Sequence, residues 1–277
     1  MRPRTAATTL LPALLLLTSC ASVPEAPPPP PSDSGGLWEI LREREIVDLT
    51  HTLDEKVPFW PGTNYFPLKT WTLARFEEVR AFSRAYSLPE HYGTHVDAPV
   101  HFAEGQASIE GVLPGNLVGP AVVFDIRGKA ALDPDAVLTP EDVDAWEALH
   151  GPVPRGAIVL LRTGWGARWG DMKAYRNFDA AGRLRFPSYG LEAARRLLVD
   201  RGCRGLGIDA LSVDRGIDAE FPVHRMGSAL GRWFLENVAA LDRLPPTGAV
   251  VVVAPLPLRG GSGAQARVLA FLPSSKQ

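Results

Sequence analysis

Three of the six histidines in the chain and one carboxylate fall within a single short segment. It reads His91-Tyr92-Gly93-Thr94-His95-Val96-Asp97-Ala98-Pro99-Val100-His101. In an extended chain alternate side chains point to the same face, so one face would carry His91, His95, Asp97 and His101. Imidazole nitrogens and carboxylate oxygens are the donor atoms that Zn²⁺ and Mn²⁺ accept in proteins. The spacing therefore predicts a metal site.

A straight strand cannot bring these four side chains together. At roughly 3.3 Å per residue, His91 and His101 would lie about 33 Å apart. The chain must bend, and Gly93 and Pro99 permit a bend because glycine admits positive φ and proline fixes φ. These two residues and Thr94 also argue against a helix. We predict a bent, largely extended arc whose ligands turn inward.

The pattern H-x-G-T-H-x-D-x-P-x-H resembles the signature of the cyclase-type metal-dependent hydrolases, which include bacterial kynurenine formamidase and isatin hydrolase. Every fixed position of the pattern is filled. The resemblance covers roughly residues 45–272 and continues in Val47–His51, Val57–Gly62, Gly207–Asp209, Phe221–His224 and Gly260–Ala264. It implies an α/β fold with a mixed sheet, of the swivelling β/β/α type.

The resemblance also implies further ligands far along the chain. His224 and Glu236 stand where dinuclear members of the family have a histidine and a glutamate. Carried over residue by residue, the first ion would be held by His91, His95 and Asp97, and the second by Asp97, His101, His224 and Glu236. The set contains no thiolate, which fits Zn²⁺ or Mn²⁺ in a catalytic site better than a closed structural zinc site. The sequence leaves open whether one or two ions bind.

A cation in such a site would lower the pKa of its water from about 15.7 toward 7 and polarise a carbonyl oxygen. The resemblance therefore implies hydrolysis of an amide or lactam C–N bond, with an arylformamide such as N-formylkynurenine or an isatin-like ring as the substrate. His101, if not fully committed to metal, or Glu236 would carry a proton to the departing nitrogen.

The turn formed by Phe59, Trp60 and Pro61 resembles the family element that lines the substrate entrance. We predict that Phe59 and Trp60 contact the aryl group of the substrate. The alternative is a turn held by its prolines, with Trp60 serving only in packing.

Two other functions are compatible with the same residues. A lipid-anchored metal-binding or adaptor protein could keep the fold and the ligands without turnover, because a fold does not guarantee a function. A polyketide-type cyclase would use a similar site for ring closure. Metal binding without hydrolysis of amides, lactams or esters would favour the adaptor.

The N-terminus has the pattern of a secretory signal, with two arginines before an apolar run, Leu10–Leu17, that is too short to span a bilayer. Leu17-Thr18-Ser19-Cys20 resembles a bacterial lipobox. We predict a lipoprotein signal peptide over residues 1–19 and lipidation of Cys20. Because Ala21 follows, we expect attachment to the periplasmic face of the outer membrane. A plain secretory signal or an uncleaved anchor is the alternative.

Residues 20–36 are rich in Pro, Gly and Ser, which predicts a semi-rigid linker. Residues 37–277 then form one hydrolase domain of ordinary size. The formal net charge of the chain is −2, so it offers no basic field for nucleic acid. The family resemblance suggests a homo-oligomer, either a dimer or a tetramer.

Helices and short apolar strands must position the ligands. The apolar, β-branched runs at 121–126 and 157–161 predict strands covered on both faces. Further strands are predicted at 46–51, 68–73, 82–88, 205–209, 249–254 and 267–272. Helices are predicted at 37–45, from the Thr139 N-cap to about Leu149, and at 191–201. Residues 221–238 have the pattern of core and turns.

Several polar residues outside the motif have plainer roles. We expect His51 to be structural, and Asp209 and Asp214 to support ligands or loops without binding metal. Cys203 is expected to pack in the core. The glycine run 260–263 predicts a tight turn and not a phosphate loop, because no Lys-Ser or Lys-Thr pair follows it.

Overall fold

The protein is described by a computed structural model covering residues 36–274. The chain divides into two units, Met1–Glu39 and Ile40–Gln277, and the fold below is that of the second unit. The predicted signal peptide, Cys20 and all of the predicted linker except Gly36 lie outside the described residues. No helix within 36–274 has the length and apolar character that crossing a membrane requires.

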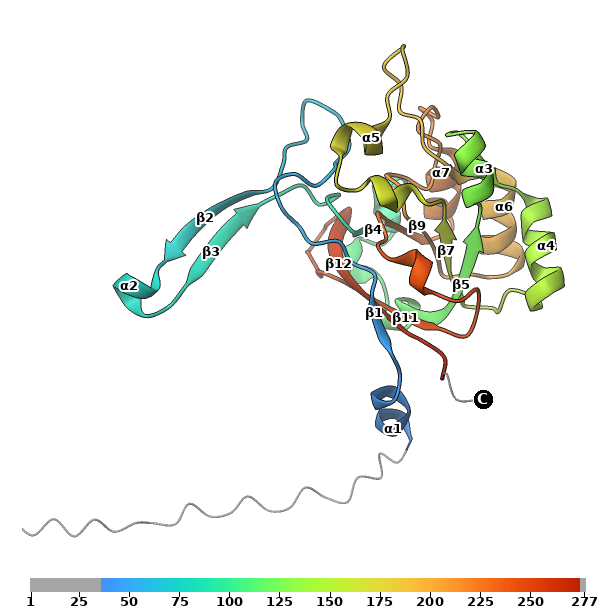
Figure 1. Cartoon of the computed structure of the whole chain (residues 1–277), viewed down its shortest axis with the longest axis horizontal. Helices are drawn as coiled ribbons and strands as arrows, with labels where there is room; N and C mark the ends of the chain where they lie inside the picture. Colours follow the sequence, from blue (N-terminus) through green and yellow to red (C-terminus); the bar gives the residue numbers. More distant parts are fainter. Residues whose placement is uncertain (1–35, 275–277) are drawn as a thin grey trace, which may run out of the picture. The chain divides into compact units, whose positions relative to one another are not determined.

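The body of the second unit is an eight-stranded sheet of mixed direction (Figure 1). Its strands are β1 (Ile46–Asp48), β4 (His95–Asp97), β5 (Val118–Asp125), β7 (Ile158–Arg162), β9 (Gly205–Ile208), β10 (Trp233–Glu236), β11 (Val250–Pro255) and β12 (Gly263–Phe271). They follow the order β1-β12-β11-β5-β7-β9-β10-β4, and β4 also pairs with β12. Because β4 pairs with both β10 and β12, seven of these strands close into a ring, and β1 lies outside the ring on β12.

Strand direction divides this sheet into two parts. Neighbouring pairs among β5, β7, β9 and β10 are parallel. The strands β1, β11, β12 and β4 make antiparallel pairs. The predicted mixed α/β fold is confirmed.

The rest of the described chain forms smaller elements. Two-stranded sheets in the described part of the chain join β2 (Lys69–Ala74) to β3 (Ser83–Ser87), and β6 (Val137–Leu138) to β8 (Ser188–Tyr189). The α-helices are α1 (Leu37–Arg42), α2 (Phe76–Val79), α3 (Arg127–Leu132), α4 (Pro140–His150), α5 (Met172–Arg176), α6 (Leu191–Arg195) and α7 (Pro222–Ala229). Short 3₁₀ helices are η1 (Pro99–His101), η2 (Ile109–Gly111), η3 (Pro114–Asn116), η4 (Trp165–Arg168) and η6 (Leu241–Arg243), and η5 (Arg196–Asp200) is a π-helical turn.

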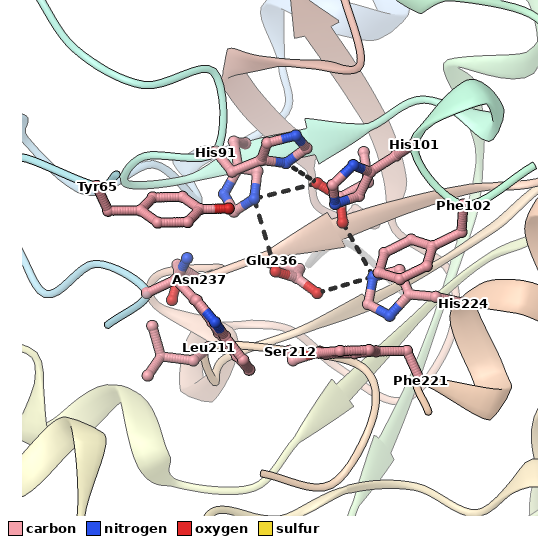
Figure 2. A pocket seen from close by; sticks show the side chains of 13 residues that line it. Tyr65, His91, His101, Phe102, Leu211, Ser212, Phe221, His224, Glu236 and Asn237 are labelled. Atoms are coloured by element: carbon pink, nitrogen blue, oxygen red, sulfur yellow. Dashed lines mark hydrogen bonds and ion pairs between the residues drawn. The ribbon is translucent and has the colours of Figure 1, made fainter. Parts of the chain in front are cut away.

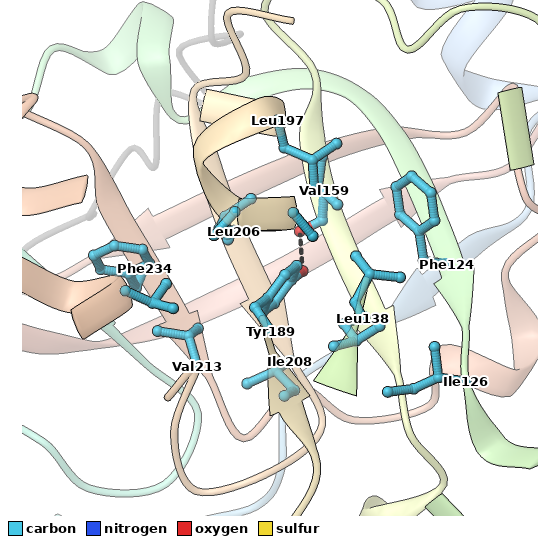
Figure 3. Close-up of a cluster of buried hydrophobic side chains, with 14 of the residues drawn as sticks. Phe124, Ile126, Leu138, Val159, Tyr189, Leu197, Leu206, Ile208, Val213 and Phe234 are labelled. Carbon is cyan, nitrogen blue, oxygen red and sulfur yellow. Dashed lines mark hydrogen bonds between the residues drawn. The ribbon is translucent and has the colours of Figure 1, made fainter. Parts of the chain in front are cut away.

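The central strands face two hydrophobic cores, one on each side of the sheet. In β7, Val159 and Leu161 belong to the core that α4, α6 and α7 cover. Their neighbours Ile158 and Leu160 belong to the other core. Figure 3 shows the first core, in which the Tyr189 hydroxyl donates to the Val159 carbonyl at 3.4 Å. Alternate residues of a strand point to opposite faces, so these strands are covered on both faces as predicted.

Most predicted elements are present, with ends shifted by a few residues. The strand predicted at 46–51 ends at Asp48, and the helix predicted at 37–45 ends at Arg42. The helix predicted at 191–201 is α-helical only to Arg195 and then widens into η5.

Core residues predicted in segment 221–238 are confirmed, but the turns predicted there are wrong, because the segment contains α7 and β10. Helix α7 starts from Phe221, which has a left-handed φ of 49°, and has Pro222 at its first position. It packs closely on β10, since a Cβ on Gly227 would lie 2.4 Å from Phe234 Cζ. The helix is short, and a tertiary contact requires its glycine.

Candidate metal centre

The arc from His91 to His101 bends where the sequence predicts. Gly93 has a φ of 67°, and a Cβ there would lie 2.1 Å from Leu53 Cδ2, so a larger residue would be strained and would have to displace that side chain. After β4 the chain turns through η1, which begins at Pro99. The turn lays the His101 ring on the His91 ring, with centroids 4.0 Å apart. The predicted bent, partly extended arc is confirmed.

Strand pairing explains how distant residues meet. In β4, His95 is the register partner of Glu236 on β10, and Asp97 is the partner of Gly263 on β12. Paired residues on neighbouring strands share a face of the sheet. The Thr94 hydroxyl donates to the backbone carbonyl of Asn237 at 2.7 Å, which fixes the start of β4 to the segment after β10.

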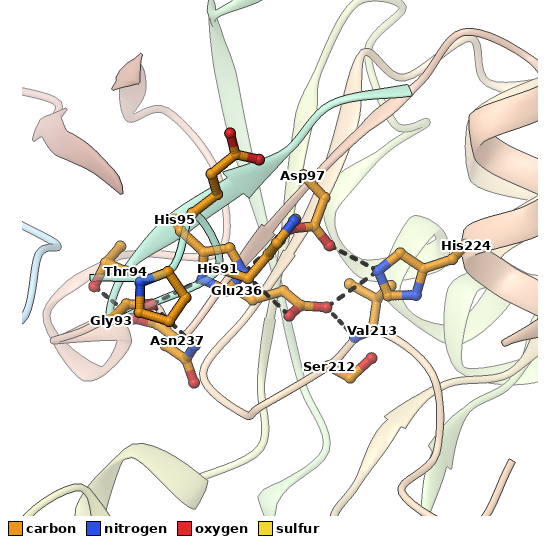
Figure 4. Close-up of polar contacts among 12 residues, drawn as sticks. His91, Gly93, Thr94, His95, Asp97, Ser212, Val213, His224, Glu236 and Asn237 are labelled. Atoms are coloured by element: carbon orange, nitrogen blue, oxygen red, sulfur yellow. Dashed lines mark hydrogen bonds and ion pairs between the residues drawn. The ribbon is translucent and has the colours of Figure 1, made fainter. Parts of the chain in front are cut away.

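Asp97 lies at the centre of the polar cluster (Figure 4). Its Oδ1 is 2.6 Å from His91 Nδ1 and 3.1 Å from His95 Nε2. Its Oδ2 is 3.0 Å from His224 Nε2. Glu236 lies 3.6 Å from His95 Nε2 and 3.2 Å from His224 Nε2. Side chains from β4, from the segment just before it, from α7 and from β10 therefore converge.

Two groups of three residues each bring their donor atoms within 4.8 Å of one another. One group is His91, Asp97 and His101, and the other is His95, Asp97 and Glu236. Both groups share Asp97, as the family resemblance implies. The division differs from the one carried over from the family, because His101 groups with His91, and His95 groups with Glu236. The assignment of ligands to individual ions stays a prediction.

Neighbouring groups hold the imidazoles in place. His95 Nδ1 is 2.9 Å from the Gly93 carbonyl, so Nδ1 carries the proton and Nε2 faces the cluster. His224 Nδ1 is 2.6 Å from Asp214 Oδ2. The same carboxylate accepts hydrogen bonds from the backbone N–H groups of Val223 and His224, so Asp214 also fixes the start of α7. Its supporting position agrees with the sequence prediction.

The cluster is electrostatically negative at its centre. Burial raises the pKa of Asp97, but the neighbouring His91 and His95 hold the pKa of that carboxyl well below its usual range. Burial lowers the pKa of His95 and of His224, but the carboxylates around them raise both pKa values overall. A field that favours positive charge on buried imidazoles also favours a bound cation.

The residues fit a divalent cation. Among the described residues, His95 Nε2 is a buried nitrogen without a hydrogen-bond partner. It is directed at the carboxylates of Asp97 and Glu236. Buried polar atoms are normally paired, and a nitrogen directed between two carboxylates is accounted for when a cation lies between them. The nitrogen and oxygen donors fit Zn²⁺ or Mn²⁺.

The cluster lines one side of a cavity of about 260 Å³ (Figure 2). The remaining wall is largely apolar and includes Trp60, Phe102, Leu211 and Phe221. Trp60 therefore reaches the cavity, as predicted for a substrate contact. Phe59 does not line it.

The Phe59 ring lies instead against Tyr92, with centroids 5.9 Å apart, and beneath the Arg176 guanidinium at 4.6 Å. These contacts place the ring in the packing of the loop. Of the two residues predicted to contact the substrate, Trp60 lines the cavity and Phe59 does not, because neighbouring side chains of this turn point in different directions.

Sequence reasoning missed several cavity residues, among them Tyr65, Ser212 and Asn237. Phe102 and Phe221 could have been proposed as cavity residues from their positions close to predicted ligands. Phe102 follows His101, and Phe221 lies three residues before His224. Tyr65 is close in sequence to Trp60, but no spacing rule marks it.

A family model described as "Putative cyclase" matches residues 47–215 of the chain. The chain belongs to this cyclase family. The isatin hydrolase of Roseibium aggregatum is 36% identical over 196 residues, which cover 68% of this chain and 74% of that protein. The kynurenine formamidase of Geobacillus thermodenitrificans is 31% identical over 227 residues, covering 80% and 94%.

A solved structure extends the similarity to the fold. Isatin hydrolase A from Labrenzia aggregata, bound to benzyl benzoate, matches with a TM-score of 0.78 at 34% identity, covering 83% of this chain and 94% of that one. The cyclase-family membership predicted from the sequence motif is confirmed. The isatin hydrolase and kynurenine formamidase relatives, together with the cluster of histidine and carboxylate donors, fit a metal-dependent hydrolase.

Other polar residues of this cyclase-family chain lie outside the cavity. The His51 ring stacks on Trp169 with centroids 3.9 Å apart, in agreement with a structural role. Asp209 accepts hydrogen bonds from Thr163 and from the Gly164 N–H, and so fixes the loop after β7. Cys203 is buried, and burial raises its pKa to about 12, as expected for a packing thiol.

Proposed function

We propose that this chain is a divalent-metal-dependent hydrolase that cleaves the C–N bond of an aryl amide or lactam, such as N-formylkynurenine, another arylformamide or an isatin-like ring. One observation carries the proposal: six nitrogen and oxygen donors from distant parts of the chain converge in a cavity with an aromatic wall. The relatives named isatin hydrolase and kynurenine formamidase support this substrate class.

The residues that would hold one or two ions are His91, His95, Asp97, His101, His224 and Glu236. When bound, Zn²⁺ or Mn²⁺ supplies Lewis acidity at a carbonyl and lowers the pKa of water. Burial lowers the pKa of His101 to about 4, so its ring is neutral at neutral pH and a ring nitrogen can accept a proton. We assign proton transfer to the departing nitrogen to His101, where it is not fully committed to metal, or to Glu236.

The positions of these two groups suit that assignment. Glu236 Oε1 accepts a hydrogen bond from the Val213 N–H at 3.2 Å, which orients the carboxylate. Figure 2 shows Glu236 and His101 on the wall of the cavity, where a reacting bond would lie between them and the aromatic side chains. Trp60, Phe102 and Phe221 would bind the aryl group and exclude water from it.

The test is hydrolysis of N-formylkynurenine and isatin by the purified protein, before and after removal of metal with a chelator. Turnover should disappear with the metal and return with Zn²⁺ or Mn²⁺. His95→Ala should lose both metal and turnover, whereas His150→Ala, at an exposed histidine on α4, should keep both. Stoichiometric metal without turnover on an amide, lactam and ester panel would instead support the adaptor alternative.

We also propose that the chain forms a homo-oligomer, a dimer or a tetramer, through the arm made of β2, α2 and β3. Its large apolar side chains are at least half exposed, namely Trp71 (50%), Leu73 (63%), Phe76 (65%), Val79 (61%) and Phe82 (56%). A two-stranded sheet is only marginally stable by itself, so such an arm needs a partner, and a second copy is always available.

Light scattering after size-exclusion chromatography tests this proposal. Leu73→Asp should shift the mass toward that of a monomer, and Thr72→Asp, at the neighbouring exposed residue, serves as the matched control. A monomeric wild-type protein would refute it.

A third proposal concerns location and rests on the sequence alone. We propose that residues 1–19 are a cleaved lipoprotein signal and that lipidated Cys20 anchors the enzyme to the periplasmic face of the outer membrane. Membrane fractionation should place the wild-type protein with outer-membrane markers and Cys20→Ser elsewhere. Recovery of the wild type without membranes would contradict it.

A further inference from the structure

Tyr65 is a polar residue of the cavity that the mechanism above does not use. It is half-buried and lines the same cavity as the ligand cluster. Figure 2 shows its hydroxyl pointing at the cluster, across from the side that Phe102 and Phe221 occupy. A molecule held against the aromatic side would therefore meet this hydroxyl.

Asn237 and Ser212, two other polar residues of the cavity that are not ligands, each have at least one hydrogen-bond partner. The Asn237 side chain donates to the Gly93 carbonyl at 3.0 Å and accepts from the Tyr175 hydroxyl at 2.9 Å. The Ser212 hydroxyl accepts from the Asp214 N–H at 3.2 Å. Within residues 36–274, no side chain or backbone group makes a hydrogen bond to the Tyr65 hydroxyl. It is left for a molecule in the cavity.

A tyrosine hydroxyl is protonated at neutral pH, because its ordinary pKa is about 10. Burial, followed by the nearby carboxylates of Asp97 and Glu236, raises the pKa of Tyr65 above its ordinary value. The phenol therefore stays protonated at neutral pH. A protonated hydroxyl that points into a cavity acts as a hydrogen-bond donor and not as a base.

The ring is held in a fixed position by its own turn. The Tyr65 N–H donates to the Gly62 carbonyl at 3.3 Å. A Cβ on Gly62 would lie 3.2 Å from Tyr65 Cδ2, so the ring packs directly on this glycine. The turn that brings Trp60 to the cavity thus also sets the direction of the hydroxyl, which reduces the reorganisation needed on binding.

We propose that Tyr65 is a further catalytic residue, whose hydroxyl donates a hydrogen bond to the scissile carbonyl oxygen of the amide or lactam. This inference rests on the proposed function. The hydrogen bond strengthens as water adds to the carbon and the oxygen gains negative charge. The C–O bond to water forms, the C–N bond breaks, and the nitrogen receives its proton through His101 or Glu236. The phenol keeps its own proton throughout.

Tyr65→Phe removes only the hydroxyl and tests the proposal. Loss of one donor to a developing oxyanion typically lowers kcat about 10²- to 10³-fold, and KM should change little. Thr247→Val, which removes an exposed hydroxyl outside both the cavity and the arm, is the control and should leave both constants unchanged. Metal content should be equal in all three proteins. An unchanged kcat in Tyr65→Phe, or a loss confined to KM, would overturn the role.

A binding measurement separates this inference from the proposed function. Isatinate, the product of isatin hydrolysis, carries the carbonyl-derived oxygen as part of a carboxylate. We expect Tyr65→Phe to bind isatinate about 10-fold more weakly than wild type, the effect of one hydrogen bond to a charged group. Tyr65-dependent binding without turnover would refute the hydrolase and support the contact. Equal binding by both proteins, or none by the wild type, would refute the contact.

Discussion

Gly263 is the residue at which the smallest change should damage the metal centre. It begins β12 opposite Asp97 of β4. A Cβ added there would lie 2.6 Å from His91 Cε1, 3.0 Å from His91 Nδ1 and 2.7 Å from the backbone oxygen of Val96. The added methyl group of Gly263→Ala therefore clashes with the predicted ligand His91 and with β4, the strand that carries the predicted ligands His95 and Asp97.

The expected size of the effect follows from these distances. Carbon atoms in contact lie about 3.5–4.0 Å apart, so the His91 ring must retreat by about 1 Å. His91 Nδ1 now lies 2.6 Å from Asp97 Oδ1, and a shift of that size breaks the contact. Overpacking costs about 1–3 kcal/mol of unfolding free energy. Disturbing the positioning of a ligand typically weakens metal binding about 10- to 100-fold.

Metal affinity by competition with a chromophoric chelator, together with thermal unfolding, would measure both effects. Gly128→Ala is the matched control, because a Cβ at Gly128 in α3 meets nothing within 4 Å. It should leave metal affinity unchanged and stability equal or higher by about 0.5–1 kcal/mol. If Gly263→Ala kept wild-type affinity and stability, the packing of His91 against β12 would be refuted.

Three further results are expected. Asp214→Asn should weaken metal binding about 10- to 100-fold in a chelator competition, because Asp214 orients His224 through a 2.6 Å contact; unchanged affinity would refute that role. Cys203 should resist iodoacetamide in the native protein and react in denaturant, as peptide mapping would show, because burial raises its pKa to about 12. Hydrogen bonds from Arg201, above all, lower the pKa of Glu147 to about 2, below its unfolded value of about 4.3. The pair therefore stabilises the fold above about pH 4, and the stabilisation is lost as pH falls toward 2. Glu147→Gln should cost about 1 kcal/mol at pH 7 and much less at pH 2 in urea unfolding, and an equal cost at both would contradict the assignment.

The local part of the site could be predicted from the sequence. His91, His95 and Asp97 come together because alternation along an extended chain and a glycine at the bend are properties of neighbouring residues. The strands of the two cores were predictable for the same reason, since their apolar runs are continuous. His224 and Glu236 could be assigned only through the family resemblance, because β10 and α7 reach the cluster by tertiary packing.

The remaining features depend on contacts that sequence patterns do not contain. Phe59 and Trp60 are adjacent, yet only Trp60 reaches the cavity, because Tyr92 and Arg176 hold the Phe59 ring elsewhere. Tyr65 is placed by the turn at Gly62, whose close contact with the ring exists only in the folded chain.

Metal analysis and anomalous scattering from crystals of the purified protein test the central claim most directly. We predict at least one divalent ion per chain, with an anomalous peak about 2.0–2.2 Å from His95 Nε2 and from a carboxylate oxygen of Asp97. A protein that contains no stoichiometric metal, or a peak that lies away from these two side chains, would contradict the metal centre and the hydrolase built on it.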